Sequence, residues 1–374
     1  MDYDLSKPQK LLQQSVRAFC QRACPAGRVR ELMETDAACD QALWRAIADQ
    51  GWIGLHLPEE QGGLGLGFVE LAVVAEELGR ACLPGPFLST TWAATLLSMG
   101  TNTKLAAERL PRLIDGTSNA TVALLEEGSG WCLSRPQVTA TAAGGHVTLN
   151  GTKHLVTDAG VADHLVVVSQ GEQGLCLVLI DRTASGVTIE AAPGIDATRK
   201  LHQVTFSNTI VPATSILAQG AEAAAALARS QQVGIVVSCA ELVGASQWLL
   251  DATVEYAKTR KQFDQVIGSF QAIQMKCADM YLETESSRAA AYYAAWALTE
   301  NTDDAARAAS IAKLYCSEAA RSVGNAAVQV HGGIGFTWEH DLHLYYKRNK
   351  ANEFLFGDAR HHREQIARLT IDAA

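Results

Sequence analysis

A block of short strand-like runs separates two helical stretches of this 374-residue chain. Between about residues 119 and 217, runs such as His164-Leu-Val-Val-Val-Ser169 alternate with turn residues. This spacing is typical of a small antiparallel barrel or sandwich. On both sides of the block, apolar residues recur at helical intervals. The order predicts an α+β protein with an N-terminal helical domain over 1–118, a central β domain over 119–218 and a C-terminal helical bundle over 219–374. Within the bundle we expect helices over 223–250, 251–259, 270–300, 304–330 and 340–369.

The composition limits the kinds of molecule that this chain is expected to bind. A hydrophobic content of 48% is ample for a core, and a charged content of 19% is low enough to suggest surface hidden in an oligomer. The net charge of −9 and the lack of a basic run argue against nucleic acid and anionic membranes. No uninterrupted apolar run reaches about 18 residues, so no membrane span is expected. Nine scattered cysteines and an N-terminus without a signal-peptide pattern favour reduced thiols and a cytoplasmic location.

Two segments near the C-terminus resemble the halves of a clamp for a dinucleotide. Tyr256, Arg260 and Phe263 have i, i+4, i+7 spacing, which predicts one shared helix face with a guanidinium between two rings. Gln329 precedes Gly332 and Gly333, where the backbone can approach a ligand closely. Neither segment is a Rossmann or Walker fingerprint. A solvated Arg and a simple helix cap remain the alternatives.

Four motifs of the chain, in this order, are similar to the acyl-CoA dehydrogenase family. They are Pro58-Glu-Glu-Gln-Gly62-Gly63-Leu-Gly65-Leu-Gly67, Leu149-Asn-Gly151-Thr-Lys153-His-Leu-Val-Thr157, Tyr256-Ala-Lys-Thr-Arg260-Lys-Gln-Phe263 with Ile267-Gly-Ser-Phe270-Gln271, and Gln329-Val-His-Gly332-Gly333-Ile-Gly335-Phe336. The resemblance implies that family's three-domain fold, FAD bound at a dimer interface, and α,β-dehydrogenation of an acyl-CoA thioester. Electrons would pass to an electron-transfer flavoprotein or a similar acceptor.

The resemblance also assigns cofactor residues. Arg260 would bind phosphate with help from its neighbours, and the segment from Gln329 to Gly333 would reach across the dimer interface into the partner's flavin site. The Thr157 hydroxyl and backbone would lie against the flavin ring, and the Leu125 backbone would line the ring's edge. The cofactor set is therefore Leu125, Thr157, Arg260, Gln262, Phe263, Phe270, Gln271, Gln329, Gly332 and Gly333.

Two family features at the flavin ring are altered. The Trp that usually stands two residues before Thr157 is Leu155 here. The family's Thr-Glu-Pro segment reads Leu125-Glu126-Glu127, so the Thr hydroxyl is lost while backbone contacts can survive.

Both positions that carry the catalytic carboxylate in the family are also changed. Phe356 stands at the usual place before Gly357, and Gly234 stands at the alternative place in a central helix. Two substitutes remain as candidates for the base, Glu241 and Asp358. Glu241 interrupts an apolar helical run, and its alternative role is pairing with a buried Arg or capping a helix. The alternative role of Asp358 is a helix N-cap.

The run from Thr337 to Tyr345, with these departures, is similar to a bacterial subgroup of the family. That subgroup often works as paired unlike subunits on bulky acyl chains such as steroid side chains. The resemblance thus implies a homo- or hetero-tetramer with a sister subunit. A non-catalytic, FAD-supporting subunit is the alternative function, and an oxygen-using flavoenzyme is a third. The cluster of five histidines and Asp341 in the last 45 residues fits no common metal motif, and no metal is expected.

Overall fold

The computed structural model describes residues 4–131 and 135–372, so Cys132 lies outside the described residues. The chain forms two compact units. The first comprises Met1–Arg30, Gly67–Leu83 and Ile235–Ala374, and the second comprises Glu31–Leu66 and Pro84–Gly234. The helices are α1 (Lys7–Ala23), α2 (Ala26–Met33), α3 (Gln41–Ala48), α4 (Phe68–Arg80), α5 (Phe87–Ser98), α6 (Thr103–Ile114), α7 (Gly220–Thr259), α8 (Gln271–Thr299), α9 (Ala305–His331), α10 (Leu342–Phe354) and α11 (Ala359–Ala367).

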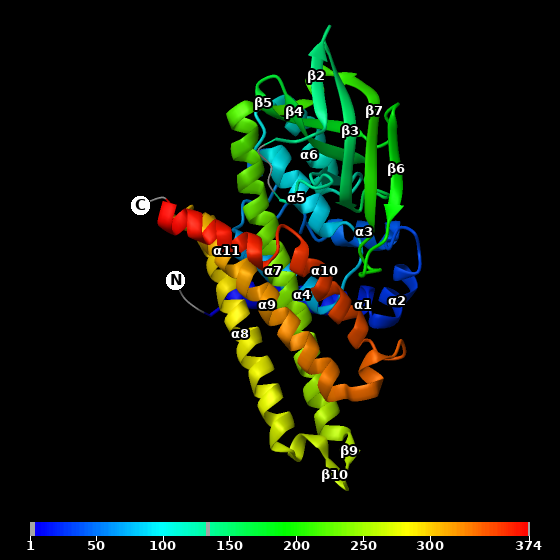
Figure 1. Cartoon of the computed structure of the whole chain (residues 1–374), viewed down its shortest axis with the longest axis vertical. Helices are drawn as coiled ribbons and strands as arrows, with labels where there is room; N and C mark the ends of the chain where they lie inside the picture. Colours follow the sequence, from blue (N-terminus) through cyan, green and yellow to red (C-terminus); the bar gives the residue numbers. More distant parts are fainter. Residues whose placement is uncertain (1–3, 132–134, 373–374) are drawn as a thin grey trace. The chain divides into compact units, whose positions relative to one another are not determined.

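The second unit contains the predicted β block as one mixed sheet (Figure 1). Its strands are β1 (Ala120–Ala123), β2 (Thr139–Ala143), β3 (His146–Thr157), β4 (His164–Gly171), β5 (Gly174–Asp181), β6 (Val187–Ala192), β7 (Leu201–Pro212) and β8 (Ile216–Gln219). The order is β6-β7-β3-β2-β4-β5-β8, and β1 pairs with β4 off this path. The β1–β4 and β2–β4 pairs are parallel and the other pairs of this sheet are antiparallel. β-Branched and Leu side chains from one face of these strands form a common core.

The first unit is helical, and it differs from the expected pattern at two places. Residues 223–259 belong to one continuous helix, α7, because no Gly-Pro or turn cluster interrupts the pattern at Leu250. The expected helix over 340–369 is instead split into α10 and α11. The break occurs where Phe356 and Gly357 adopt left-handed φ angles of 62° and 108°. The expected helices over 270–300 and 304–330 are confirmed as α8 and α9, which lie side by side (Figure 1).

Two glycines let α4 and α7 pack with their backbones in contact. A Cβ on Gly244 would lie 1.8 Å from the Glu76 carbonyl oxygen, and a Cβ on Gly79 would lie 2.3 Å from that of Glu241. α7 is long and apolar enough to cross a membrane, but 89% of its most apolar window is buried inside the protein. A buried core helix of a globular protein has the same composition, so this helix gives no indication of a membrane span.

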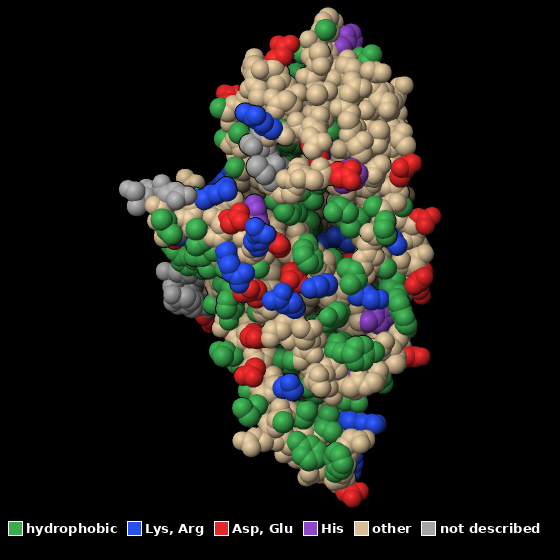
Figure 2. Space-filling model, in the orientation of Figure 1, with side chains coloured by type: hydrophobic (Ala, Val, Ile, Leu, Met, Phe, Trp, Pro, Cys, Tyr) green, Lys and Arg blue, Asp and Glu red, His purple; other side chains and the backbone are tan. Residues whose placement is uncertain are grey.

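Several large apolar side chains are exposed on the first unit. On the face drawn in Figure 2, hydrophobic side chains gather on the part of the surface that the long helices form. The exposed set of this unit includes Phe263, Met275, Tyr281, Leu282, Phe336 and Trp338. Exposed apolar surface of this kind is typical of a protein that buries it against another subunit.

Candidate active site

The segment around Arg260 is a β-hairpin rather than the end of a helix. α7 ends at Thr259, with the Arg260 N–H donating to the Tyr256 carbonyl over 2.8 Å. Residues Lys261–Gln262 (β9) then pair antiparallel with Gln265–Val266 (β10). The two residues between them, Phe263 and Asp264, have φ angles of 54° and 63°, as a tight primed turn requires. The prediction that Tyr256, Arg260 and Phe263 share one helix face is therefore wrong, because the turn carries Phe263 away to 84% exposure.

The hairpin nevertheless gathers the predicted phosphate-binding residues. The Ile267 N–H donates to the Arg260 carbonyl over 2.8 Å, which closes the hairpin back onto the end of α7. The Phe263 and Phe270 rings meet edge to face at 6.1 Å. Gln271 begins α8 directly after Phe270, and the side chains of Arg260, Gln262 and Gln271 are exposed. This end of the first unit thus presents a guanidinium, two amides and the Phe263 ring to the outside, while Phe270 is half-buried against a small apolar cluster.

The second half of the clamp adjoins the first. Gly332 ends α9 with φ 63°, and a Cβ on Gly332 or Gly333 would meet nothing within 4 Å. The backbone here is open to a ligand. The ring of His331, directly before Gly332, stacks on the Tyr256 ring with centroids 4.4 Å apart. Because Tyr256 lies one turn before Arg260, this stack holds the ends of α7 and α9 together.

These two segments fit the phosphate-rich half of a dinucleotide. The Arg260 fork supplies charge, and the open backbone at Gly332 and Gly333 allows close approach. Gln329 lies one turn before the glycines on α9 and is exposed. The cofactor role that the resemblance implies for this set stays a prediction.

In the second unit, Leu125 and Thr157 are fixed to the same strand, β3. The Leu125 carbonyl accepts a hydrogen bond from the His154 N–H over 2.8 Å. The Thr157 carbonyl accepts one from the Thr121 hydroxyl over 2.7 Å. Between them the β3–β7 register shifts, and Leu155 turns outward with φ 52°. The structure thus joins the two predicted ring-edge residues through one irregular strand end.

A buried ion pair that the sequence analysis did not identify supports this strand end. Lys153 Nζ lies 2.6 Å from Glu126 Oε1, with side-chain exposures of 0% and 3%. The same ammonium donates to the Leu124 carbonyl over 3.0 Å. Burial lowers the pKa of Lys153 to about 8, although Glu126 opposes that shift. The only hint in the sequence is that Lys153 stands at an inward position between Gly151 and Val156 of an apolar strand.

The two candidate bases both have structural partners. Glu241 is 3% exposed, and its Oε2 accepts a hydrogen bond from Asn352 Nδ2 over 3.0 Å. Asp358 is the N-cap of α11, where its Oδ1 accepts from the His361 N–H over 2.9 Å. At the family's usual base position, Phe356 is buried and directed into the protein. The structure thus gives Asp358 the capping role that the sequence offered as its alternative.

A fully buried lysine fixes the helix that leads to Phe356. Lys313 Nζ donates to the Asn352 and Glu353 carbonyls over 2.9 and 3.0 Å and to the Ser317 hydroxyl over 2.8 Å. It therefore satisfies carbonyls in the last turn of α10 that have no partner within the helix. Burial lowers the pKa of Lys313 to about 8.

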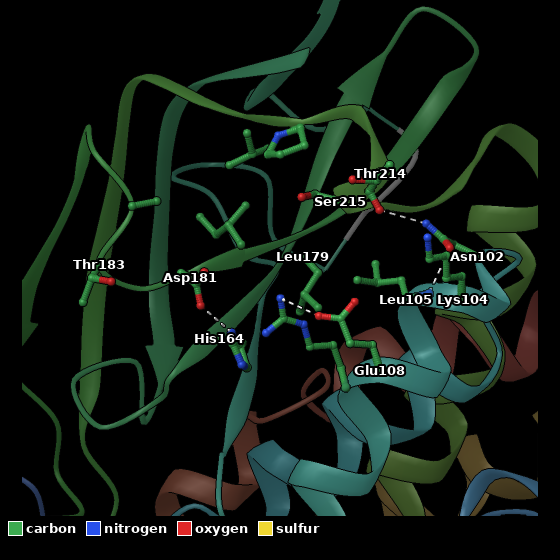
Figure 3. Close-up of a pocket in the computed structure, with 15 residues that line it drawn as sticks. Asn102, Lys104, Leu105, Glu108, His164, Leu179, Asp181, Thr183, Thr214 and Ser215 are labelled. Carbon is green, nitrogen blue, oxygen red and sulfur yellow. Dashed lines mark hydrogen bonds and ion pairs between the residues drawn. The ribbon is translucent and has the colours of Figure 1, made fainter. Parts of the chain in front are cut away.

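One cavity of about 510 Å³ lies within the second unit, apart from these residues (Figure 3). Figure 3 shows His164 facing Asp181, whose Oδ1 lies 3.0 Å from His164 Nδ1, and Asn102 bonded to the backbone near Thr214. None of the predicted cofactor or base residues lines it. Over residues 4–131 and 135–372, no group of three or more His, Cys, Asp or Glu side chains is arranged to hold a metal ion.

Comparison with known proteins gives the family. Models of the N-terminal, middle and C-terminal domains of acyl-CoA dehydrogenase match residues 6–117, 121–209 and 225–370. Acyl-CoA dehydrogenase IpdE2 of Mycolicibacterium smegmatis is 34% identical over 373 residues, which are 98% of this chain and 99% of that protein. A solved structure named Tcur3481-Tcur3483 steroid ACAD is 30% identical with a TM-score of 0.89, covering 98% of both chains.

A second solved structure, the ChsE4-ChsE5 complex of Mycobacterium tuberculosis, is 29% identical with a TM-score of 0.90 and again covers 98% of both chains. The predicted α+β fold, with helical, β and helical segments in that order, is confirmed by these matches. The chain belongs to the acyl-CoA dehydrogenase family, whose members are flavin-dependent oxidoreductases that act on the CH–CH bond of acyl-CoA thioesters.

Proposed function

We propose that this chain is one of two unlike subunits of an FAD-dependent acyl-CoA dehydrogenase that acts on a bulky, steroid-derived acyl chain. The observation that carries the proposal is the buried Phe356 at the position where the family usually places its carboxylate. A phenyl ring cannot accept a proton, and Gly234 leaves the alternative position without a side chain. The two solved relatives are named as pairs of chains, and one of them as a steroid enzyme.

The chain's contribution is binding and orientation. Arg260, supported by Gln262, Phe263, Phe270 and Gln271, would grip the phosphates of FAD, and Gln329 with Gly332 and Gly333 would complete the clamp. Leu125 and Thr157 would hold the ring. FAD, when bound, supplies the acceptor for the hydride that leaves Cβ of the thioester. The sister subunit would supply the carboxylate that removes the α-proton.

Glu241 is the remaining base candidate in this chain, and it defines a second candidate function. A carboxylate buried in α7 would make the chain a self-sufficient dehydrogenase. The hydrogen bond from Asn352 argues against this role, because it holds the carboxylate in a contact between α7 and α10. We further propose that the enzyme is cytoplasmic and passes electrons to an electron-transfer flavoprotein or a similar acceptor.

The substrate class can be tested with the chain purified together with the subunit that it assembles with. Turnover would be compared for a CoA thioester of a steroid side chain and for butyryl-CoA, with ferrocenium as the electron acceptor. The proposal expects kcat/KM to favour the steroid thioester by at least about 100-fold, the discrimination that a shaped apolar pocket gives when several groups differ. Equal or inverted preference would contradict the proposed substrate.

A further inference from the structure

The ion pair between Lys153 and Glu126 contacts the backbone next to the residues that would bind the flavin ring. Glu126 follows Leu125 in the chain, and Lys153 precedes Thr157 by four residues on β3. Both charged groups are buried, with Nζ and Oε1 only 2.6 Å apart. Burying two charges costs desolvation free energy that an apolar pair of the same size would not cost. We therefore assign the ion pair a role in fixing the local backbone rather than in stabilising the fold.

Each charged group binds backbone as well as its partner. Lys153 Nζ donates to the Leu124 carbonyl, next to Leu125. Glu126 accepts from the Val138 N–H over 2.9 Å through Oε1 and from the Gln137 N–H over 2.5 Å through Oε2. The pair therefore ties together three pieces of backbone: the segment after β1, the residues before β2, and β3.

The same strand end carries the irregularity that sets Thr157. Immediately after Lys153 the pairing of β3 with β7 shifts, and it resumes at Val156. Leu155, in the shifted stretch, has a positive φ, and His154 donates its N–H to the Leu125 carbonyl. A shift of this kind disrupts the ladder of strand–strand hydrogen bonds, so another interaction has to hold the backbone at this point. The bonds from Lys153 and His154 to residues 124–126 do so.

We propose that Lys153 and Glu126 are positioning residues that hold the Leu125 and Thr157 backbones in the arrangement that binds the flavin ring. The inference rests on the proposed binding of FAD and adds which residues hold the ring site in place. It also explains why a ring site can survive the loss of the Thr hydroxyl at position 125. The proposed ring site consists of backbone groups, and the buried ion pair of Lys153 and Glu126 holds that backbone in place.

The residues that follow Glu126 in the chain fit the same interpretation. Gly128 and Gly130 follow Glu126 with φ angles of 71° and 53°, and a Cβ on either would meet nothing within 4 Å. Open backbone of this kind, held next to a fixed strand end, allows a ligand to approach the N–H groups closely.

The test uses the assembled protein, purified with its sister subunit, and a double variant, Lys153→Met with Glu126→Gln. Both charges are removed together, so neither is left buried alone, and the single Gln oxygen can still accept from one of the two neighbouring N–H groups. The readouts are the dissociation constant for FAD, the visible circular-dichroism bands of bound flavin, and the thermal midpoint. Lys313→Met is the matched control, because Lys313 is also fully buried and lies in the other unit.

The proposal expects the double variant to bind FAD about tenfold or more weakly, the effect of losing one charge-assisted hydrogen bond, with altered flavin bands. Lys313→Met should lower the thermal midpoint and leave the flavin bands unchanged. Unchanged affinity and bands in a folded double variant would overturn the inference. A wild-type assembly that binds no FAD would overturn the proposed function, and this inference with it.

Discussion

Asn352 Nδ2 donates a hydrogen bond to Glu241 Oε2 over 3.0 Å, and both side chains are buried in the first unit. The bond links α10 to α7 at the one acidic residue that interrupts the apolar run of α7. The carboxylate of Glu241 thus has a structural role, because its contact with Asn352 joins the two helices.

Glu241→Gln is therefore expected to leave turnover of the assembled enzyme within about threefold of wild type. The Gln side chain keeps an oxygen that can accept from Asn352, so the helix contact survives. The measurement is kcat with FAD content determined on the same sample. A loss of about 10²–10⁴ with full FAD content, the size of a general-base contribution, would instead identify Glu241 as the base.

Arg260→Lys tests the phosphate clamp. The variant keeps the positive charge but loses the planar fork, so FAD affinity should fall by about tenfold or more. Lys258→Ala is the matched control, because Lys258 is two residues away, exposed, and paired with Glu255. Titration of the apoprotein with FAD gives both values. Equal affinity of Arg260→Lys and wild type would remove Arg260 from the cofactor site.

Gly244→Ala tests the backbone contact between α4 and α7. The new methyl group would lie 1.8 Å from the Glu76 carbonyl oxygen, so the helices must separate. We expect a loss of at least about 1–3 kcal/mol in the free energy of unfolding. Gly27→Ala in α2 is the opposite case, because a Cβ there meets nothing within 4 Å, and it should gain about 0.5–1 kcal/mol. Urea unfolding of both variants measures whether each substitution raises or lowers the free energy of unfolding. An increase for Gly244→Ala would show that α4 and α7 are not in backbone contact.

Lys313 should make stability depend on pH. Burial lowers its pKa from 10.5 to about 8, so the folded state holds the proton less tightly than the unfolded chain. The unfolded state therefore binds more protons between about pH 8 and 10.5, and this contribution to stability rises with pH across that window. The free energy of unfolding of wild type, measured relative to that of Lys313→Met, should rise by roughly 2 kcal/mol from pH 7.5 to pH 9.5. Exposed Lys258→Met should show no such difference, and a flat comparison for Lys313→Met would contradict the assigned shift.

The periodicity of the sequence was enough to predict the order of helical and β segments, because buried faces repeat at fixed intervals. The periodicity did not predict individual residues correctly where a turn replaces the last residues of an expected helix. The spacing from Tyr256 to Phe263 fits a helix face, but two left-handed residues end the pattern in a hairpin. Likewise, the split between α10 and α11 depends on Phe356 adopting a φ angle that few non-glycine residues adopt, which no periodicity reveals.

The motifs at Arg260, Gly332 and Gly333 predict cofactor-binding chemistry from the sequence, and these positions stay predictions. The candidate site was not predictable where a role depends on three-dimensional pairing. The contact of Lys153 with Glu126 joins residues 27 apart in sequence, and the bond of Glu241 to Asn352 joins residues 111 apart. Whether a buried carboxylate is a base or a structural partner is decided by such contacts.

The central claim, that this chain works with an unlike subunit, is tested most directly by one comparison. FAD per chain and turnover with a steroid side-chain CoA thioester would be measured for the chain purified alone and for the chain purified with its sister subunit. The account predicts negligible turnover for the chain alone, and turnover with bound FAD only for the assembly. A homomeric sample of this chain that holds FAD and is bleached anaerobically by the thioester would contradict it.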